Sequence, residues 1–257
     1  MFPIVHHYMN LQTQSKVDPF MMLGSLYPDL SSISKIDRDL SHQMGDDFYQ
    51  WCKQKAPEAK TLAQGVISHG SRPPGIDYYA DEYWPGGKKG WCFQKGMPWM
   101  AKVAETTHLS SDLIWWKAHN FVEISLELIT VAQNPQLPDE LVQATANEVT
   151  VKETAELLCA YWREKGLETK PAQIIEAYKR APQLYALDQP DPLHMAQKQY
   201  EGFIRRDLTH QADIGAMAEL LAIMSLELVE DYNPFMNKLK LLLLQTMDHY
   251  KNKAVSQ

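Results

Sequence analysis

Apolar residues recur every three to four positions along most of the chain, which is the period of an amphipathic α-helix. In the second half this pattern predicts helices over five ranges: 138–166, 171–184, 193–207, 211–231 and 235–252. The Asn233-Pro234 pair predicts a break between the last two helices, because proline cannot donate the helical hydrogen bond. Few stretches alternate between apolar and polar residues as a half-buried strand does, so the pattern predicts an all-α fold.

The first half of the chain is less regular. Helical patterns cover 43–56, 58–70 and 110–132, and between the last two the segment 70–96 is rich in glycine and proline, which predicts irregular chain. The same region holds seven large aromatic residues: Tyr78, Tyr79, Tyr83, Trp84, Trp91, Phe93 and Trp99. We favour a satellite core beneath a long loop; the alternative is that these aromatic side chains wall a pocket.

The chain has 257 residues, of which 45% are apolar and 22% charged, values typical of a folded globular unit. We expect a single all-α domain over 1–257, in which 1–132 carry the aromatic loop and the chemistry described below, and 135–257 form a C-terminal helical layer. The longest uninterrupted apolar run, 157–162, is far shorter than the ~18 residues of a membrane span. With no export signal in the first residues either, the sequence predicts a cytoplasmic protein.

Charge and cysteine content narrow the expected partners. The formal net charge is −7, from 25 Lys+Arg and 32 Asp+Glu, so nucleic acid is not expected as a stable partner. The three cysteines, Cys52, Cys92 and Cys159, are an odd number without a C-x-x-C pair, which predicts reduced packing thiols instead of disulfides. No feature of the sequence predicts an oligomeric state.

Nine histidines are present, and six of them fall at or before residue 119. His119 and Glu123 are four residues apart, so they project from the same face of the helix predicted over 110–132. Taken alone, such a pair is more often a surface hydrogen bond. This helix is apolar on most sides, however, and a carboxylate that enters a core needs a partner, which a metal ion can supply.

Three further residues are candidates for the same chemistry. His69 ends the apolar stretch 62–69, inside which Gly65 permits close packing; the alternative is a satisfied core histidine. Asp29 ends an apolar run, where it can also be a helix cap or an Asx-turn. His42 can equally be a surface histidine.

The order of these motifs resembles the zinc-dependent phospholipase C-like superfamily over about residues 6–127. That all-helical superfamily includes bacterial phospholipase C, the N-terminal domain of glycosylphosphatidylinositol-specific phospholipase D and, more distantly, single-strand-specific fungal nucleases. The Leu-Gly-x-x-x-Pro-Asp motif of 23–29 is the most specific match. The other matches are His6-His7 for the family's Thr-His, with His7 as the ligand, then His42 with Phe48 downstream, Gly65 to His69, and His119 to Glu123.

The resemblance implies a multi-helix bundle of the phospholipase C type, with additional C-terminal helices, around a metal site. Its implied ligands are His7, Asp29, His42, His69, Asp77, Asp81, His119 and Glu123. Two departures from the family pattern affect the expected metal. The segment 71–75 is inserted before Asp77, and Asp81 stands where the family has histidine. Zinc is the first expectation, but a site with more oxygen ligands can also bind iron, manganese or nickel.

The implied function is a metal-dependent hydrolase that activates water at a di- or trinuclear divalent site and cleaves a phosphoester. In this scheme Asp77 bridges the metals, and Asp29 orients or deprotonates the water. The expected substrate is a small phosphoester or a phospholipid-like molecule. Two alternatives stay open: a non-hydrolytic metal-binding protein with a redox or regulatory role, and an inactive interaction protein that retains the site.

Overall fold

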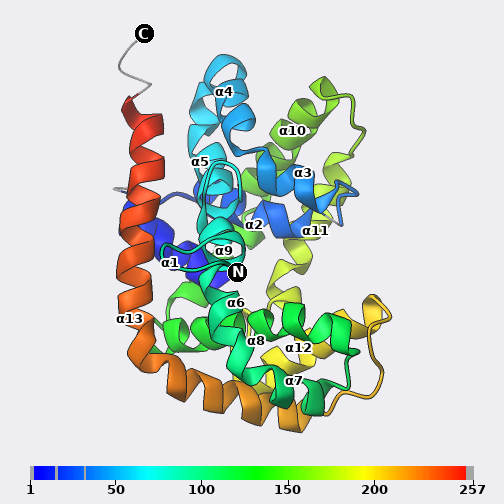
Figure 1. Cartoon of the computed structure of the whole chain (residues 1–257). Helices are drawn as coiled ribbons and strands as arrows, with labels where there is room; N and C mark the ends of the chain where they lie inside the picture. Colours follow the sequence, from blue (N-terminus) through cyan, green and yellow to red (C-terminus); the bar gives the residue numbers. More distant parts are fainter. Residues whose placement is uncertain (1–2, 15–16, 32, 253–257) are drawn as a thin grey trace.

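The computed structural model describes residues 3–14, 17–31 and 33–252, so both ends of the predicted 1–257 domain lie outside the described residues. Within those ranges the chain forms helices and turns and no strand, which confirms the all-α prediction. The α-helices are α1 (Pro3–Thr13), α2 (Pro19–Leu30), α3 (Arg38–Gln43), α4 (Gly45–Lys55), α5 (Lys60–His69), α6 (Trp91–Gly96), α7 (Met100–Thr107), α8 (Ser111–Gln133), α9 (Leu137–Ala146), α10 (Glu148–Glu164), α11 (Pro171–Leu184), α12 (Pro192–Arg205) and α13 (Ile214–Asn252), and Figure 1 shows their arrangement.

The predicted helix over 138–166 is in fact two helices, α9 and α10, which are separated at Asn147. The side-chain oxygen of Asn147 accepts a hydrogen bond from the Thr150 N–H at 3.1 Å and thereby caps α10. Asparagine favours such a cap over a helix interior because its short side chain bonds to nearby backbone groups. Hydrophobic periodicity continues across the break, which is why the pattern alone joined the two helices.

The predicted break at Asn233-Pro234 is wrong, because α13 runs through Pro234 without interruption. Proline removes a helical hydrogen bond and bends a helix, and Figure 1 shows α13 turning sharply between its first and second halves. Tyr232 and Phe235 beside the proline are 0% and 2% exposed, and the Tyr232 hydroxyl lies 2.9 Å from Thr130 Oγ1 of α8. Packing on both sides of the proline therefore preserves the helix.

The aromatic loop is more ordered than the sequence indicates. It contains α6 and one π-helical turn over Tyr78–Glu82, so the prediction of irregular chain over 70–96 is only partly correct. The Trp91 ring stacks on Phe235 of α13 at a centroid distance of 4.1 Å, and Trp84 lies 5.1 Å from the same ring. Most of the loop aromatics thus pack into the main core and do not form a separate satellite core, whereas Phe93 stacks on His119.

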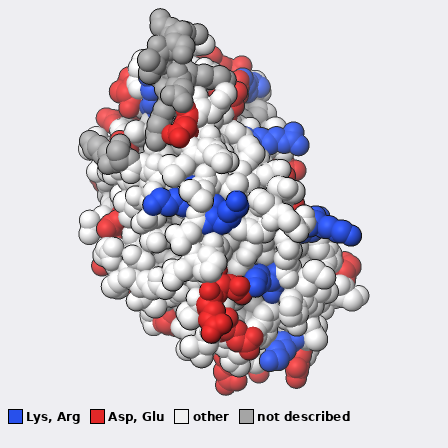
Figure 2. Space-filling view, turned by 60° about the vertical axis from the view of Figure 1, so that its left-hand side comes forward, with Lys and Arg blue, Asp and Glu red and all other residues white. Residues whose placement is uncertain are grey.

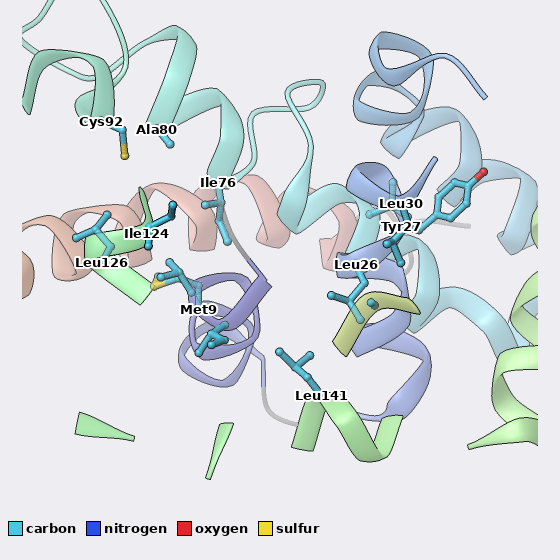
Figure 3. Packing of buried hydrophobic residues seen from close by; sticks show 14 of the residues in the cluster. Met9, Leu26, Tyr27, Leu30, Ile76, Ala80, Cys92, Ile124, Leu126 and Leu141 are labelled. Atoms are coloured by element: carbon cyan, nitrogen blue, oxygen red, sulfur yellow. The ribbon is translucent and has the colours of Figure 1, made fainter. Parts of the chain in front are cut away.

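One cluster of buried apolar side chains connects the two halves of the chain (Figure 3). Leu26 of α2 lies near Leu141 of α9, while Met9 of α1 and Ile76 of the loop lie near Ile124 of α8. The three cysteines are buried and free of disulfides, as predicted. These contacts fix α1, α2 and α8, the helices that carry half of the candidate ligands, against one another.

Within the described part of the chain, no helix is both long enough and apolar enough to cross a membrane. The face drawn in Figure 2 carries basic and acidic residues in small separate groups around a broad uncharged area.

Candidate metal centre

Two glycines bring the backbones of α2 and α5 into contact. A Cβ atom at Gly24 would lie 2.0 Å from the Leu62 carbonyl oxygen, and one at Gly65 would lie 2.2 Å from that of Met21. No larger residue fits at either position without separating the helices. The close packing expected at Gly65 is therefore present, and it places His69, at the end of α5, beside Asp29, near the end of α2.

Backbone carbonyls orient the two histidines of this region. His69 Nδ1 lies 2.6 Å from the Ser25 carbonyl oxygen, and His42 Nδ1 lies 2.8 Å from that of Arg38. A carbonyl oxygen only accepts hydrogen bonds, so each Nδ1 carries the proton, and each Nε2 lone pair is available in the neutral ring. Both buried Nε2 atoms lack a hydrogen bond within the described part of the structure, which is the arrangement of histidines that bind metal.

These Nε2 atoms converge on two carboxylates and form the four-residue cluster of Asp29, His42, His69 and Asp77. Asp77 Oδ2 lies 3.3 Å from each Nε2, and Asp29 Oδ1 lies 3.4 Å from that of His42 and 3.8 Å from that of His69. Ligand atoms about 2.1 Å from a tetrahedral metal are themselves about 3.4 Å apart. The four side chains therefore fit one divalent cation with two nitrogen and two oxygen ligands.

A proton occupies this cluster when metal is absent. Burial lowers the pKa of His42, but Asp29 and Asp77 beside it prevail and raise this pKa to about 9. A cation at the cluster must displace that proton, because only the neutral ring offers Nε2 as a ligand. Asp29 and Asp77 thus stabilise a positive charge between them even when no metal is bound.

A second group, the three-residue cluster, consists of Asp81, His119 and Glu123. Asp81 belongs to the π-helical turn, a feature frequent at functional sites, and follows Asp77 by four residues, so the two clusters are neighbours. The His119 ring stacks on Phe93 at 4.1 Å, and Asn120 Nδ2 donates to Glu123 Oε2 at 3.0 Å. Asn120 Nδ2 also lies 3.1 Å from His119 Nε2.

The electrostatics of the three-residue cluster also favour a cation. Burial first, and then the charge of Glu123, raise the pKa of Asp81 well above its usual value. Burial lowers the pKa of His119 to about 4, so this ring is neutral near pH 7 and does not balance the two acids. A divalent cation there would offset the repulsion between the carboxylates, as well as their desolvation.

The structure places His6, and not the predicted His7, at the four-residue cluster. The His6 ring stacks on His69 at 4.0 Å, and its Nε2 lies 3.4 Å from Asp77 Oδ1. His7 points to α9, where its Nε2 lies 2.6 Å from Glu140 Oε2; a carboxylate accepts, so this nitrogen donates. The sequence pair His6-His7 was ambiguous, because neighbouring residues of a helix face different directions.

Glu127, which follows Glu123 by one helical turn, holds the start of α1 in place. Its carboxylate accepts hydrogen bonds from the Ile4 N–H at 2.9 Å and the Val5 N–H at 2.6 Å. These are amides of the first turn of α1, which have no partner within the helix. Glu127 is therefore not one of the clustered ligands; it positions the helix that carries His6.

The structure brings the remaining seven predicted ligands into the two clusters and adds three basic residues that the sequence did not single out. Arg38 Nη2 lies 3.7 Å from Asp77 Oδ2, and the Arg38 side chain is 59% exposed. Burial, then the positive charge of Arg206, lower the pKa of Lys117 to about 8, while Glu123 opposes the shift. Burial, then Arg205 and Arg38, lower the pKa of Arg206 as well. Of the three, Arg38 is the one in direct contact with a clustered ligand.

Comparison of the chain with protein-family models, with curated proteins and with solved structures finds no match.

Proposed function

We propose that the protein is a metal-dependent hydrolase that cleaves a phosphoester at two adjacent divalent metal sites. The observation that carries this proposal is the convergence of the His42 and His69 Nε2 atoms on Asp29 and Asp77, next to the buried acids of the three-residue cluster. Neighbouring sites of this kind are typical of hydrolases that act on phosphate esters. The match to the motif order of the zinc-dependent phospholipase C-like superfamily supports the same function.

The side chains suggest how the reaction is divided among them. The cations, when bound, act as Lewis acids toward a phosphoryl oxygen and acidify water. Asp29 is 22% exposed, the most accessible side chain of the four-residue cluster, so its carboxylate can take a proton from water that enters from solvent. Asp77, 4% exposed and in contact with His6, His42 and His69, holds the cluster together.

The ligand set narrows the choice of metal without fixing it. Two imidazoles with two carboxylates suit zinc, which we propose first. One imidazole with two carboxylates at the three-residue cluster is a harder site and suits iron, manganese or nickel as well. The proposed substrate is a small phosphoester or a phospholipid-like molecule.

The test is a panel of phosphate monoesters and diesters, assayed with protein as purified, after removal of metal by a chelator, and after each metal is restored. We expect hydrolysis that disappears with the chelator and returns with zinc or another first-row metal. A protein that holds metal but hydrolyses no member of the panel would contradict the proposal and favour a non-hydrolytic metal protein. Optical or paramagnetic iron signals would then identify a redox centre.

A further inference from the structure

Arg38 is an exposed cation in contact with the four-residue cluster. Its Nη2 lies 3.7 Å from Asp77 Oδ2, and the Arg38 side chain is 59% exposed whereas that of Asp77 is 4% exposed. Arg38 is the first residue of α3, and its side chain reaches from solvent to this buried carboxylate. An ion pair with one exposed partner contributes little to stability, so stability alone does not account for this position.

The contact with Asp77 uses little of the hydrogen-bonding capacity of Arg38. A distance of 3.7 Å exceeds that of a hydrogen bond, in which the two heavy atoms are about 2.7–3.2 Å apart. Asp77 Oδ2 also lies 3.3 Å from the Nε2 atoms of both His42 and His69, so several groups share this oxygen. A guanidinium carries N–H donors in a planar fork that matches the oxygens of a phosphate group. Arg38 therefore keeps donors for a ligand that arrives from solvent.

Solvent reaches the four-residue cluster beside two side chains of opposite charge. Arg38 is 59% exposed and Asp29 is 22% exposed, whereas His42, His69 and Asp77 are only 1% to 4% exposed. A substrate that approaches the buried ligands must therefore pass Arg38 and Asp29. Arg38 attracts a phosphate group and Asp29 repels it, so the phosphoryl group is expected on the Arg38 side and the attacking water on the Asp29 side.

We propose that Arg38 is a catalytic residue that binds the phosphoryl oxygens of the substrate. This inference rests on the proposed function, since it names the side chain that holds the substrate at the same centre. As the water oxygen bonds to phosphorus, the proton of the water passes to Asp29, and the ester oxygen leaves and takes a proton from solvent. The Arg38 N–H groups donate to the phosphoryl oxygens and stabilise their negative charge during this exchange.

A role of Arg38 in holding Asp77 for the metal would have a different signature. Arg38 is a cation beside a proposed cation site, so Arg38→Gln should bind zinc as tightly as the wild type or more tightly. The substitution keeps the backbone carbonyl that lies 2.8 Å from His42 Nδ1, so His42 should stay in place. Weaker zinc binding by Arg38→Gln would mean that Arg38 positions Asp77, and would overturn the proposal.

The first test asks whether a phosphate group contacts Arg38. Zinc-loaded protein is treated with phenylglyoxal, a reagent that modifies accessible arginine side chains, with and without inorganic phosphate, and each modified arginine is located by peptide mass spectrometry. Phosphate at ten times its dissociation constant should slow the modification of Arg38 about 10-fold. Arg163, an exposed arginine of α10, is the internal control and should react at the same rate in both samples. Equal modification of Arg38 in both samples would overturn the proposal.

The second test compares variants of Arg38 at equal zinc content. Arg38→Gln should bind inorganic phosphate about 10-fold more weakly by calorimetry, because it removes a charged hydrogen-bond donor. It should also lower kcat for phosphoester hydrolysis about 10²-fold, and Arg38→Lys should lie between it and the wild type, because lysine keeps the charge and loses the fork. Arg163→Gln is the matched control and should behave like the wild type.

The two proposals fail in different ways. Zinc-dependent hydrolysis that Arg38→Gln does not change would refute the role of Arg38 and leave the hydrolase intact. Protein that holds zinc and in which phosphate protects Arg38, but that cleaves no ester, would leave Arg38 as a phosphate-binding residue and refute the hydrolase. Protein that holds no metal would refute both.

Discussion

The two clusters share a chemistry but differ in how firmly the fold holds their ligands. In the four-residue cluster the side chains come from α2, α3, α5 and the loop before the π-helical turn, and backbone carbonyls fix both imidazoles. The three-residue cluster draws only on that turn and on α8, and its imidazole is held by ring stacking on Phe93 and by Asn120. Ligands held in place before binding lose less entropy when metal arrives. The four-residue cluster is therefore expected to bind metal more tightly and to fill first.

The clusters also differ in which side chain has a raised pKa when no metal is bound. The four-residue cluster contains a histidine whose pKa is raised to about 9, so it carries a proton near pH 7. In the three-residue cluster burial lowers the pKa of the histidine to about 4, while burial and then Glu123 raise the pKa of Asp81 well above its usual value. Metal at either cluster competes with a proton, so binding should release protons to the buffer.

Removal of His69 is expected to have the largest effect. His69→Ala deletes a ligand that contacts both carboxylates of the four-residue cluster, so we expect loss of one metal per chain and at least ~10³-fold lower phosphoester hydrolysis. Elemental analysis and initial rates measure both effects. His210→Ala, which alters an exposed His–Asp pair, is the control and should retain metal and activity. Circular dichroism should show unchanged helicity; collapse of the fold would favour a core histidine instead.

His119→Ala tests the other side of the comparison. It should remove only the weaker metal, so titration with zinc should show a single tight site that resembles the first site of the wild type. Phosphoester hydrolysis should also fall, because two cations share the work of charge stabilisation. If His119→Ala released both metals, the two clusters would be one cooperative unit, and the proposed order of filling would be wrong.

His6 and His7 provide a matched pair at adjacent positions of α1. His6→Ala should lower metal affinity about 10- to 100-fold, because His6 stacks on His69 and contacts Asp77. His7→Ala should leave metal affinity unchanged and reduce the free energy of unfolding by about 1–2 kcal/mol, since it breaks the bond to Glu140. Zinc titrations and chemical denaturation distinguish the two. The reverse outcome would support the ligand that the family motif implies.

Glu127→Gln is expected to have the smallest effect on metal. A glutamine presents one acceptor oxygen where Glu127 uses two, so one of the Ile4 and Val5 amides loses its partner, at a cost of about 1–2 kcal/mol of stability. Metal affinity should change only a few-fold, because α1 is shifted slightly and not unfolded. Glu227→Gln, on the exposed side of α13, should have the stability of the wild type. Equal stability of both variants would contradict the capping role.

Local patterns in the sequence predicted much of the fold and of the site. The helix over 110–132 and the spacing of His119 and Glu123 are properties of one segment, and the structure reproduces them in α8. The predicted helix break at Pro234 was wrong because burial of Tyr232 and Phe235 preserves the helix there. Burial of these side chains is a tertiary effect, which local sequence patterns do not contain.

The basic residue at the four-residue cluster was not predicted either. Arg38 contacts Asp77 only because the fold brings these distant segments together, and nothing in the sequence around Arg38 indicates that contact. Nor did the sequence favour His6 over His7, because the choice depends on how α1 is rotated against α5 and α9. Contacts between distant segments determine each of these positions.

The central claim, that the clustered side chains bind metal, is tested most directly by elemental analysis of protein purified without a chelator and then dialysed. We expect about two divalent transition metals per chain, one for each cluster, and about one in His69→Ala and in His119→Ala. Less than about one transition metal per chain in the wild type, after zinc has been supplied during purification, would contradict it.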